Sequence, residues 1–247
     1  MANPGYDSLV ARFYDAFLEG RSDDAAWFVD YFKDKEGPLL ELAAGTGRIL
    51  VPLLRGGVDA EGLDNSAEML AVAAAKLRAA GLSCALHEMD MTDCRLDRKY
   101  AQVLVACGSF MLLDDEGARR CLIGARDLLR EGGQLVLDLF IPWDDIRRGR
   151  TEGFLVARDV GMGEERCLVH ESFEHVVADQ VKRGVYKYER YVGGALAETR
   201  VSNLDLRWYH EAEILALLRD CGWRDARVRT DWPGYARNES FMVTAAR

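Results

Sequence analysis

A glycine-rich turn and a carboxylate that follows it have the residue types and the spacing of a nucleotide-binding site. The apolar run of residues 38–44 breaks at Gly45-Thr46-Gly47, and a second apolar stretch ends at Asp64. Glycines in such a turn let a ligand lie against the backbone, because no Cβ intervenes. A carboxylate at the tip of the next strand can accept hydrogen bonds from both hydroxyls of a ribose. The pattern predicts an adenosine-containing cofactor across the first two strands.

Three details of this segment favour a cationic cofactor over a dinucleotide. Leu50 occupies the position where the dinucleotide fingerprint requires a third glycine. Glu41 precedes the turn, and its charge repels a pyrophosphate but suits a cation. Asp64 lies 17 residues after Gly47, a suitable reach for a ribose-binding acid. S-adenosylmethionine, which carries a ribose, a sulfonium and an ammonium but no phosphate, satisfies all three conditions.

The two motifs resemble those of the class I S-adenosylmethionine-dependent methyltransferases. Residues 39–48 (LLELAAGTGR) look like the family's first motif, and residues 62–70 (GLDNSAEML) look like its second. The resemblance implies a Rossmann-like fold, S-adenosylmethionine as the cofactor, and methyl transfer as the activity. It also implies that Asp90 and Met91 contact the adenine, and that the residues after the fourth strand touch the cofactor through their backbone.

Two helices are expected before the first core strand, because apolar residues between Tyr6 and Phe32 have helical spacing. In the resembling family such helices form a lid over the cofactor. Tyr14 matches a recurrent lid tyrosine of that family, and Arg21 lies near a lid arginine that meets the cofactor's carboxylate. The residues expected to bind the cofactor are therefore Tyr14, Arg21, Glu41, Ala43, Gly45, Gly47, Asp64, Asn65, Met69, Asp90, Met91, Ala106 and Cys107.

The order of strands and helices predicts an α/β chain with a doubly wound, Rossmann-like sheet of seven strands. The sheet is expected to be mostly parallel with an antiparallel last strand, as continuously apolar strands indicate. From residue 154 the pattern changes to alternation around a Gly193-Gly194 turn, which predicts an antiparallel β insertion after strand five. The expected organisation is a helical lid at 1–35, a cofactor-binding core at 36–143, the insertion at 144–209, and a C-terminal helix and strand pair at 210–247 that completes the core.

The insertion is expected to form a wall of the pocket for a small-molecule acceptor and to offer a homodimer surface. It leaves the sheet after strand five, whose C-terminal end faces the cofactor crevice. A small antiparallel sheet also has edges that proteins tend to cover or pair. The methyl acceptor is expected to be a nitrogen or an oxygen of a metabolite. The aromatic candidates for binding it are Phe110, Phe140, Trp143, Tyr188 and Trp208.

The overall charge argues against a nucleic-acid partner. The net charge is −9 and the pI about 5.1, whereas nucleic-acid surfaces gather lysine and arginine. No apolar run approaches the ~18 residues of a membrane-spanning helix, and no signal peptide is expected at the N-terminus. The six cysteines form no C-x-x-C pair, which indicates thiols of a reducing compartment and a cytoplasmic protein.

Methyl transfer from a sulfonium requires alignment more than acid–base chemistry, so no catalytic residue is assigned. No metal site is expected, because His170 and His175 differ by five positions and would face opposite sides of a strand. Three alternatives remain open. The first is an enzyme of the same fold that cyclises the cofactor or transfers another of its groups. The second is a nicotinamide dehydrogenase, which Leu50 and Glu41 argue against. The third is a non-catalytic nucleotide-binding module.

Overall fold

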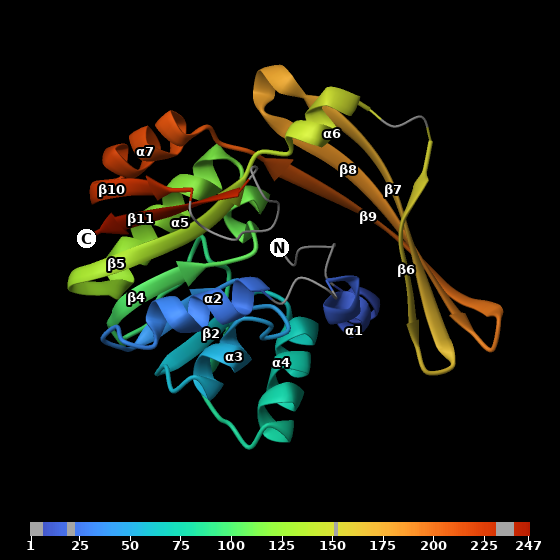
Figure 1. Cartoon of the computed structure of the whole chain (residues 1–247), viewed down its shortest axis with the longest axis horizontal. Coiled ribbons are helices and arrows are strands. Elements are labelled where there is room, and N and C mark those ends of the chain that lie inside the picture. The colour runs from blue at the N-terminus through green and yellow to red at the C-terminus, as the bar shows by residue number, and fades with distance from the viewer. Residues whose placement is uncertain (1–6, 19–22, 151–152, 231–239) are drawn as a thin grey trace.

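The computed structural model describes residues 7–18, 23–150, 153–230 and 240–247. Across these ranges the chain forms a seven-stranded sheet flanked by helices and a separate four-stranded sheet, shown in Figure 1. The larger sheet is the core of the nucleotide-binding fold. The smaller sheet curves away from it, and the first helix lies between the two.

The core sheet has the strand order β10-β11-β5-β4-β1-β2-β3 within the described residues. All its strands are parallel except β11, which runs antiparallel to both β5 and β10. This arrangement confirms the predicted doubly wound sheet with an antiparallel last strand. The strands are β1 (Leu39–Leu42), β2 (Ala60–Asp64), β3 (Leu86–Glu88), β4 (Tyr100–Val105), β5 (Leu129–Phe140), β10 (Arg224–Arg229) and β11 (Ser240–Ala246).

Helices cover both faces of this sheet, because its central strands are apolar on both sides. Every residue of β1 is buried, and one apolar cluster under α5 and α7 is separate from another under α2 and α3. Ser66 caps α4, since its Oγ accepts a 3.2 Å hydrogen bond from the Met69 N–H. The helices are α2 (Asp23–Phe32), α3 (Leu50–Arg55), α4 (Ala67–Ala79), α5 (Asp115–Leu128) and α7 (Glu211–Asp220), with a 3-10 helix η1 (Ser109–Leu112).

Strand β5 begins at Leu129, directly after α5, and runs through the Gly132-Gly133 pair. The left-handed φ of 73° at Gly132 accommodates an irregularity inside the strand, and the pairing with β4 shifts register at this point. The short helix α6 (Trp143–Arg148) follows β5.

The insertion is an antiparallel sheet with the order β6-β7-β8-β9, as the alternating pattern predicts. The turn between the last two strands is Gly193-Gly194, with φ values of 56° and 84°. The strands are β6 (Leu155–Met162), β7 (Glu165–Val176), β8 (Val181–Val192) and β9 (Ala195–Arg207), and the 3-10 helix η2 (Val177–Asp179) joins β7 to β8.

The inner face of the insertion packs on α1 (Ser8–Phe17) rather than on the core sheet directly. Phe13 of α1 is fully buried in a cluster with Cys167, Val169 and Tyr188 of the insertion. Burying a phenylalanine of this kind stabilises the contact by about 1.5–3 kcal/mol. Figure 1 shows the resulting arrangement, with α1 between α4 and the curved sheet. No helix in the described part of the chain is long and apolar enough to cross a membrane.

Candidate active site

The first core strand ends in a turn whose backbone borders open space. Ala43, Gly45 and Gly47 all have left-handed φ values, of 55°, 55° and 73°. Such values suit glycine, which has no Cβ to clash with the backbone. A Cβ placed on Gly45 would meet no atom within 4 Å, and Gly45 lines a cavity. A ligand can therefore lie directly against this turn.

Asp64 ends β2 and joins the glycine turn to the helix that follows. Its Oδ2 accepts a 2.8 Å hydrogen bond from the Gly45 N–H, and its Oδ1 accepts one of 2.9 Å from the Ser66 N–H. Burial raises the pKa of Asp64, and the N–H groups of Ser66, Gly45 and Asn65 oppose that rise. A carboxylate has about four lone-pair directions, so acceptor capacity remains for ribose hydroxyls.

A cavity of about 230 Å³, which we call the first cavity, opens at the C-terminal ends of the core strands. Open α/β sheets bind ligands at this edge. Part of η1 closes the first cavity on one side. It brings together many of the residues expected to bind the cofactor. Those in its lining are Tyr14, Ala43, Gly45, Asp64, Asn65, Met69, Asp90 and Met91.

Asp90 lies in the first cavity just after β3. Its Oδ1 accepts hydrogen bonds from the N–H and the hydroxyl of Thr92, both at 2.8 Å. Burial alone would raise the pKa of Asp90, but the two bonds from Thr92, together with the Asn65 side chain and the charge of the N-terminus, leave that pKa below its usual value. Asp90 is therefore a hydrogen-bond acceptor at neutral pH, which its expected role toward an adenine amine requires.

Glu41 lies beneath the glycine turn, outside the cavity lining. It is 2% exposed, and its Oε2 has no hydrogen-bond partner among the described residues. Burial raises the pKa of Glu41 to about 8, while Arg48 acts to lower it and Asp64 and Asp138 raise it further. A buried acceptor without a donor is unfavourable, and the ammonium of S-adenosylmethionine would supply that donor. The residues present therefore fit this cofactor.

Four other residues expected to bind the cofactor do not line the first cavity. Gly47 is buried in the turn before α3, and Ala106 is buried in the core cluster next to that helix. Cys107 lines a neighbouring cavity, and its Sγ accepts a 2.6 Å hydrogen bond from the Arg48 guanidinium. Arg21 lies outside the described residues.

A second cavity, also of about 230 Å³, adjoins the first and shares Tyr14, Ser109 and Leu112 with it. Its remaining lining comes from the end of α1, the loop after β4, the end of β5, and the inner face of the insertion. The lining residues used below are Phe17, Phe140, Arg158, Glu171, Tyr186 and Tyr188. The insertion thus forms one wall of a pocket next to the first cavity.

The structure separates the aromatic candidates for acceptor binding. Phe140 and Tyr188 line the second cavity. Phe110 and Trp208 are 0% and 1% exposed within the main core cluster, so packing already uses their apolar surface. Trp143 is on α6 and 38% exposed, away from both cavities. These last three residues line neither cavity, whereas the prediction rested on their size and their position along the chain.

Two charged residues of the second cavity, Arg158 and Glu171, are not among the residues that the sequence predicts. The position of Glu171 could have been predicted from the sequence, because alternation along β7 places it on the same face as the buried Cys167 and Val169. Arg158 reaches the cavity through a register shift in β6, which no local pattern in the sequence indicates.

Helix α1 carries Tyr14 to the boundary of both cavities and is fixed to the glycine turn. The Thr46 hydroxyl donates a 2.6 Å hydrogen bond to Asp15 of α1, and the Lys76 ammonium of α4 pairs with the same carboxylate at 2.7 Å. At the other end, Asp7 caps the helix by accepting from the Leu9 N–H at 3.0 Å. The two contacts of Asp15 therefore tie α1 to the glycine turn and to α4 beside the first cavity.

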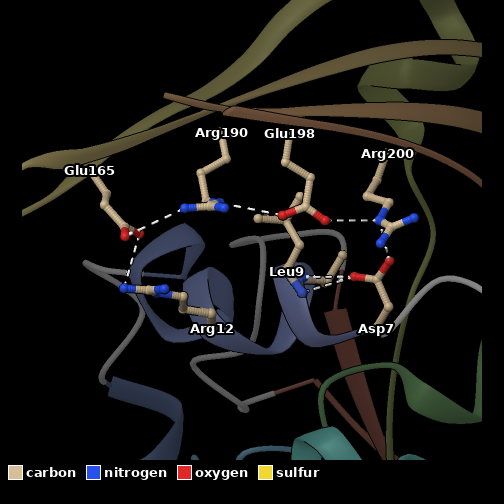
Figure 2. A network of polar contacts seen from close by, with 8 residues as sticks. Asp7, Leu9, Arg12, Glu165, Arg190, Glu198 and Arg200 are labelled. Atoms are coloured by element: carbon tan, nitrogen blue, oxygen red, sulfur yellow. Dashed lines mark hydrogen bonds and ion pairs between the residues drawn. The ribbon is translucent and has the colours of Figure 1, made fainter. Parts of the chain in front are cut away.

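A chain of charged side chains, which we call the clasp, joins α1 to the insertion sheet, as Figure 2 shows. Three arginines alternate with three carboxylates, and successive partners lie 3.0–3.5 Å apart. The clasp connects the N-terminal cap of α1 to three strands of the insertion. In order, its members are Arg12, Glu165, Arg190, Glu198, Arg200 and Asp7.

Replacing Arg190 by glutamine is expected to loosen the clasp. Arg190 is 23% exposed and lies between Glu165 and Glu198, which would then keep only their outer partners, Arg12 and Arg200, with no cation between them. We expect a loss of about 1–2 kcal/mol in the free energy of unfolding, measured in urea. The matched control is Arg183→Gln on the same strand, where the side chain is 57% exposed and lies 4.0 Å from Asp179. Equal losses in the two variants would contradict this account of the clasp.

The two histidines of β7 have different partners. His170 lies 2.9 Å from Glu189, whereas the Nδ1 of the buried His175 lies 2.9 Å from the Gly149 carbonyl. Their alternation along β7 places them on opposite faces of the sheet, as predicted. Within the described ranges, no group of three or more histidine, cysteine or acidic side chains is arranged to hold a metal ion.

Comparison with known proteins gives matches to methyltransferases. A methyltransferase domain family matches residues 39–133. A protein of Geobacillus sp. (strain WCH70), provisionally named a methyltransferase, is 30% identical over 142 residues, covering 54% of this chain and 57% of that protein. The dTDP-3-amino-3,6-dideoxy-alpha-D-glucopyranose N,N-dimethyltransferase of Streptomyces fradiae is 33% identical over 105 residues, 40% of each protein. The matched segment thus spans about half the length of these curated relatives.

Solved structures share the fold over nearly the whole chain. The CcbJ methyltransferase of Streptomyces caelestis is 21% identical, with a TM-score of 0.77 over 99% of this chain and 98% of that one. The sugar N-methyltransferase KedS8 of Streptoalloteichus sp. ATCC 53650 is 24% identical, with a TM-score of 0.73 over 95% and 92%. A methyltransferase domain family thus matches the cofactor-binding strands, and nearly the whole chain shares the fold of these solved structures.

Proposed function

We propose that this protein transfers the methyl group of S-adenosylmethionine to a nitrogen of a small molecule bound in the second cavity. The observation that carries the proposal is that the two cavities adjoin and share Tyr14, Ser109 and Leu112. A cofactor held by Asp64 and the glycine turn and an acceptor in the second cavity would therefore be neighbours. We also propose that the other residues expected to bind the cofactor, including Arg21, contact S-adenosylmethionine.

When bound, S-adenosylmethionine would supply a methyl group already activated on a sulfonium, so that the nitrogen lone pair could bond to the methyl carbon in line as the C–S bond breaks and S-adenosylhomocysteine leaves. The chain's task is to align the acceptor and to exclude water. Asp64 and Asp90 hold the adenosine end in place. The aromatic rings of Phe140 and Tyr188 and the end of α1 cover the second cavity. Proximity and orientation are the catalytic devices in this proposal.

A nitrogen acceptor is supported by the names of two similar proteins. The Streptomyces fradiae relative is an N,N-dimethyltransferase of a dTDP-linked amino sugar, and KedS8 is a sugar N-methyltransferase. The half-buried carboxylate of Glu171 in the second cavity also suits a basic nitrogen more than a neutral hydroxyl. An amino sugar is accordingly the first acceptor to test.

The test uses S-adenosylmethionine with a deuterated methyl group and two dTDP sugars that differ only in an amine or a hydroxyl at one carbon. We expect S-adenosylhomocysteine and a labelled methyl on dTDP-3-amino-3,6-dideoxy-alpha-D-glucopyranose, detected by mass, with no label on the hydroxyl sugar. Label on the hydroxyl sugar alone would reassign the acceptor to oxygen. Consumption of the cofactor without any methylated product would instead indicate a cyclising or group-transferring enzyme and overturn the proposal.

We also propose a homodimer through the insertion sheet. β6 and β9 are its edges, and such edges are commonly paired or covered. Large apolar side chains are exposed on these two strands, with Val156 at 61% and Val201 at 63%, and such exposure is typical of interaction surfaces. Light scattering at micromolar concentration should give the mass of two chains. The mass of one chain would contradict the dimer.

A reducing compartment, the cytoplasm, is the proposed location. All six cysteines are free thiols, and four of them are buried. Proteins of oxidising compartments more often pair their cysteines in disulfides. The distribution of a fluorescent fusion would test this proposal.

A further inference from the structure

The second cavity has two charged side chains among its described lining residues, Glu171 on β7 and Arg158 on β6. The remaining lining is aliphatic, aromatic or uncharged. In a mostly apolar pocket, a few charged groups decide which ligand binds and how it is oriented. The two strands are adjacent, and Arg158 is in register with Val169, which precedes Glu171 on the inner face. The cavity wall therefore offers one anion and one cation close together.

Glu171 is held in place by a buried lysine and keeps one oxygen for a ligand. The Lys182 ammonium donates to the Glu171 Oε1 at 3.1 Å and to the Asp145 Oδ2 at 3.2 Å. Lys182 is 7% exposed, and its ammonium lies 4.3 Å from the centre of the Phe173 ring. No described residue donates to the other oxygen of Glu171. A positioned carboxylate with a free oxygen is a binding site for an N–H donor.

The surroundings leave a negative charge at Glu171. Lys182 shares its single positive charge between Glu171 and Asp145. Arg148 approaches the other oxygen of Asp145 at 3.7 Å, but its side chain is 71% exposed, so water and salt screen it. This end of the cavity therefore favours a cationic group such as an ammonium.

A β-bulge directs Arg158 into the cavity. Val156 pairs with His170 and Arg158 pairs with Val169, so Ala157 is the extra residue of the bulge. Without the bulge, Arg158 would point to the outer face. Its guanidinium donates to the carbonyls of Phe17, at the C-terminus of α1, and of Ala157, at 3.4 and 2.7 Å. No carboxylate of the described residues lies within ion-pairing distance of it, so the exposed guanidinium can bind an anion.

We propose that the acceptor carries both an amine and an anionic group, with Glu171 binding the amine as an ammonium and Arg158 binding the anion. The ammonium loses one proton to water before its nitrogen lone pair attacks the methyl group. This inference rests on the proposed function, because it takes the second cavity to be the acceptor site. Both residues determine specificity, and neither takes part in making or breaking bonds. Lys182 is a positioning residue for Glu171. A phosphate or a carboxylate would satisfy Arg158, since a guanidinium binds either group through two parallel hydrogen bonds.

The test measures binding by calorimetry to the full chain saturated with S-adenosylhomocysteine. The probes are glucosamine 1-phosphate, glucose 1-phosphate, glucosamine and glucose, which carry both charged groups, one of them, or neither. Glucosamine 1-phosphate should bind most tightly, with each group contributing about tenfold or more. Glucuronate, compared with glucose 1-phosphate, shows which anion Arg158 prefers.

The variants assign each contribution to one residue. Glu171→Gln should abolish the gain from the amine and keep the gain from the phosphate, and Arg158→Gln should do the reverse. The matched controls, Glu174→Gln on β7 and Arg183→Gln on β8, are exposed positions outside the cavity and should keep both gains. The proposal would be overturned if Glu171→Gln kept the affinity gain from the amine or Arg158→Gln kept the gain from the phosphate. It would also be overturned if the four sugars bound with equal affinity or did not bind. Binding of S-adenosylhomocysteine in the same samples tests the proposed function separately and reports that each variant is folded.

Discussion

Replacing Asp64 by alanine is expected to weaken the binding of S-adenosylmethionine by about 100-fold or more. The carboxylate would lose two hydrogen bonds to ribose hydroxyls, each worth about 1.5–3 kcal/mol because one partner is charged. It would also lose its bonds from the N–H groups of Gly45 and Ser66, which hold the glycine turn. Calorimetry on the purified variant measures the change in affinity.

The control for this variant is Asp93→Ala, which removes another acid after a core strand. Asp93 is 73% exposed, pairs with Arg95 at 3.2 Å, and does not line the first cavity. Its loss should leave the affinity for S-adenosylmethionine within about twofold of the unmodified protein. An Asp64→Ala variant that binds as tightly as this control would show that the ribose lies elsewhere.

Replacing Glu41 by glutamine is expected to remove a large part of the pH dependence of stability. Burial raises the folded-state pKa of Glu41 from 4.5 to about 8, so the folded protein holds a proton that the unfolded chain releases. The contribution of protonated Glu41 to the free energy of unfolding is therefore fully present below pH 4.5 and is lost as the pH rises toward 8. The loss amounts to roughly 4–5 kcal/mol for the cofactor-free protein.

Asp138 acts in the same direction over a lower range of pH. It is 4% exposed, and burial raises its pKa from 3.8 to about 7, against a hydrogen bond from the Gly108 N–H. Urea denaturation from pH 5 to 9 should show stability falling with pH in the unmodified protein. The slope should be smaller in Glu41→Gln and smallest in the double variant with Asp138→Asn. Stability that rises with pH over this range would contradict the assignment.

The same protonation couples to the cofactor. Glu41 must be ionised to accept from an ammonium, so the affinity for S-adenosylmethionine should fall by up to tenfold per pH unit as the pH decreases below 8. In Glu41→Gln the affinity should be lower at pH 8.5 and nearly independent of pH. A variant with the pH profile of the unmodified protein would show that another group meets the ammonium.

The cofactor side of the fold could be predicted from the sequence because its signals are local. The glycine turn, the acid at the end of β2 and the cap at Ser66 are short patterns whose geometry follows from the residues themselves. The insertion could be predicted equally well, because alternation and a Gly193-Gly194 turn specify a hairpin wherever that hairpin packs.

The acceptor side could not be predicted to the same extent because it depends on tertiary packing. Trp208 and Phe110 have the size of pocket residues, yet the core buries them completely. Arg158 points inward because of one extra residue in β6, and Glu171 matters because Lys182, on the next strand, holds it. None of these relations appears as a spacing along the chain.

Calorimetric titration of the unmodified protein with S-adenosylmethionine, and separately with NAD, tests the central claim most directly. We expect one S-adenosylmethionine site per chain, loss of that binding in Asp64→Ala, and no heat from NAD, because Glu41 beneath the turn suits a cation and not a pyrophosphate. Binding of NAD without binding of S-adenosylmethionine would contradict the account.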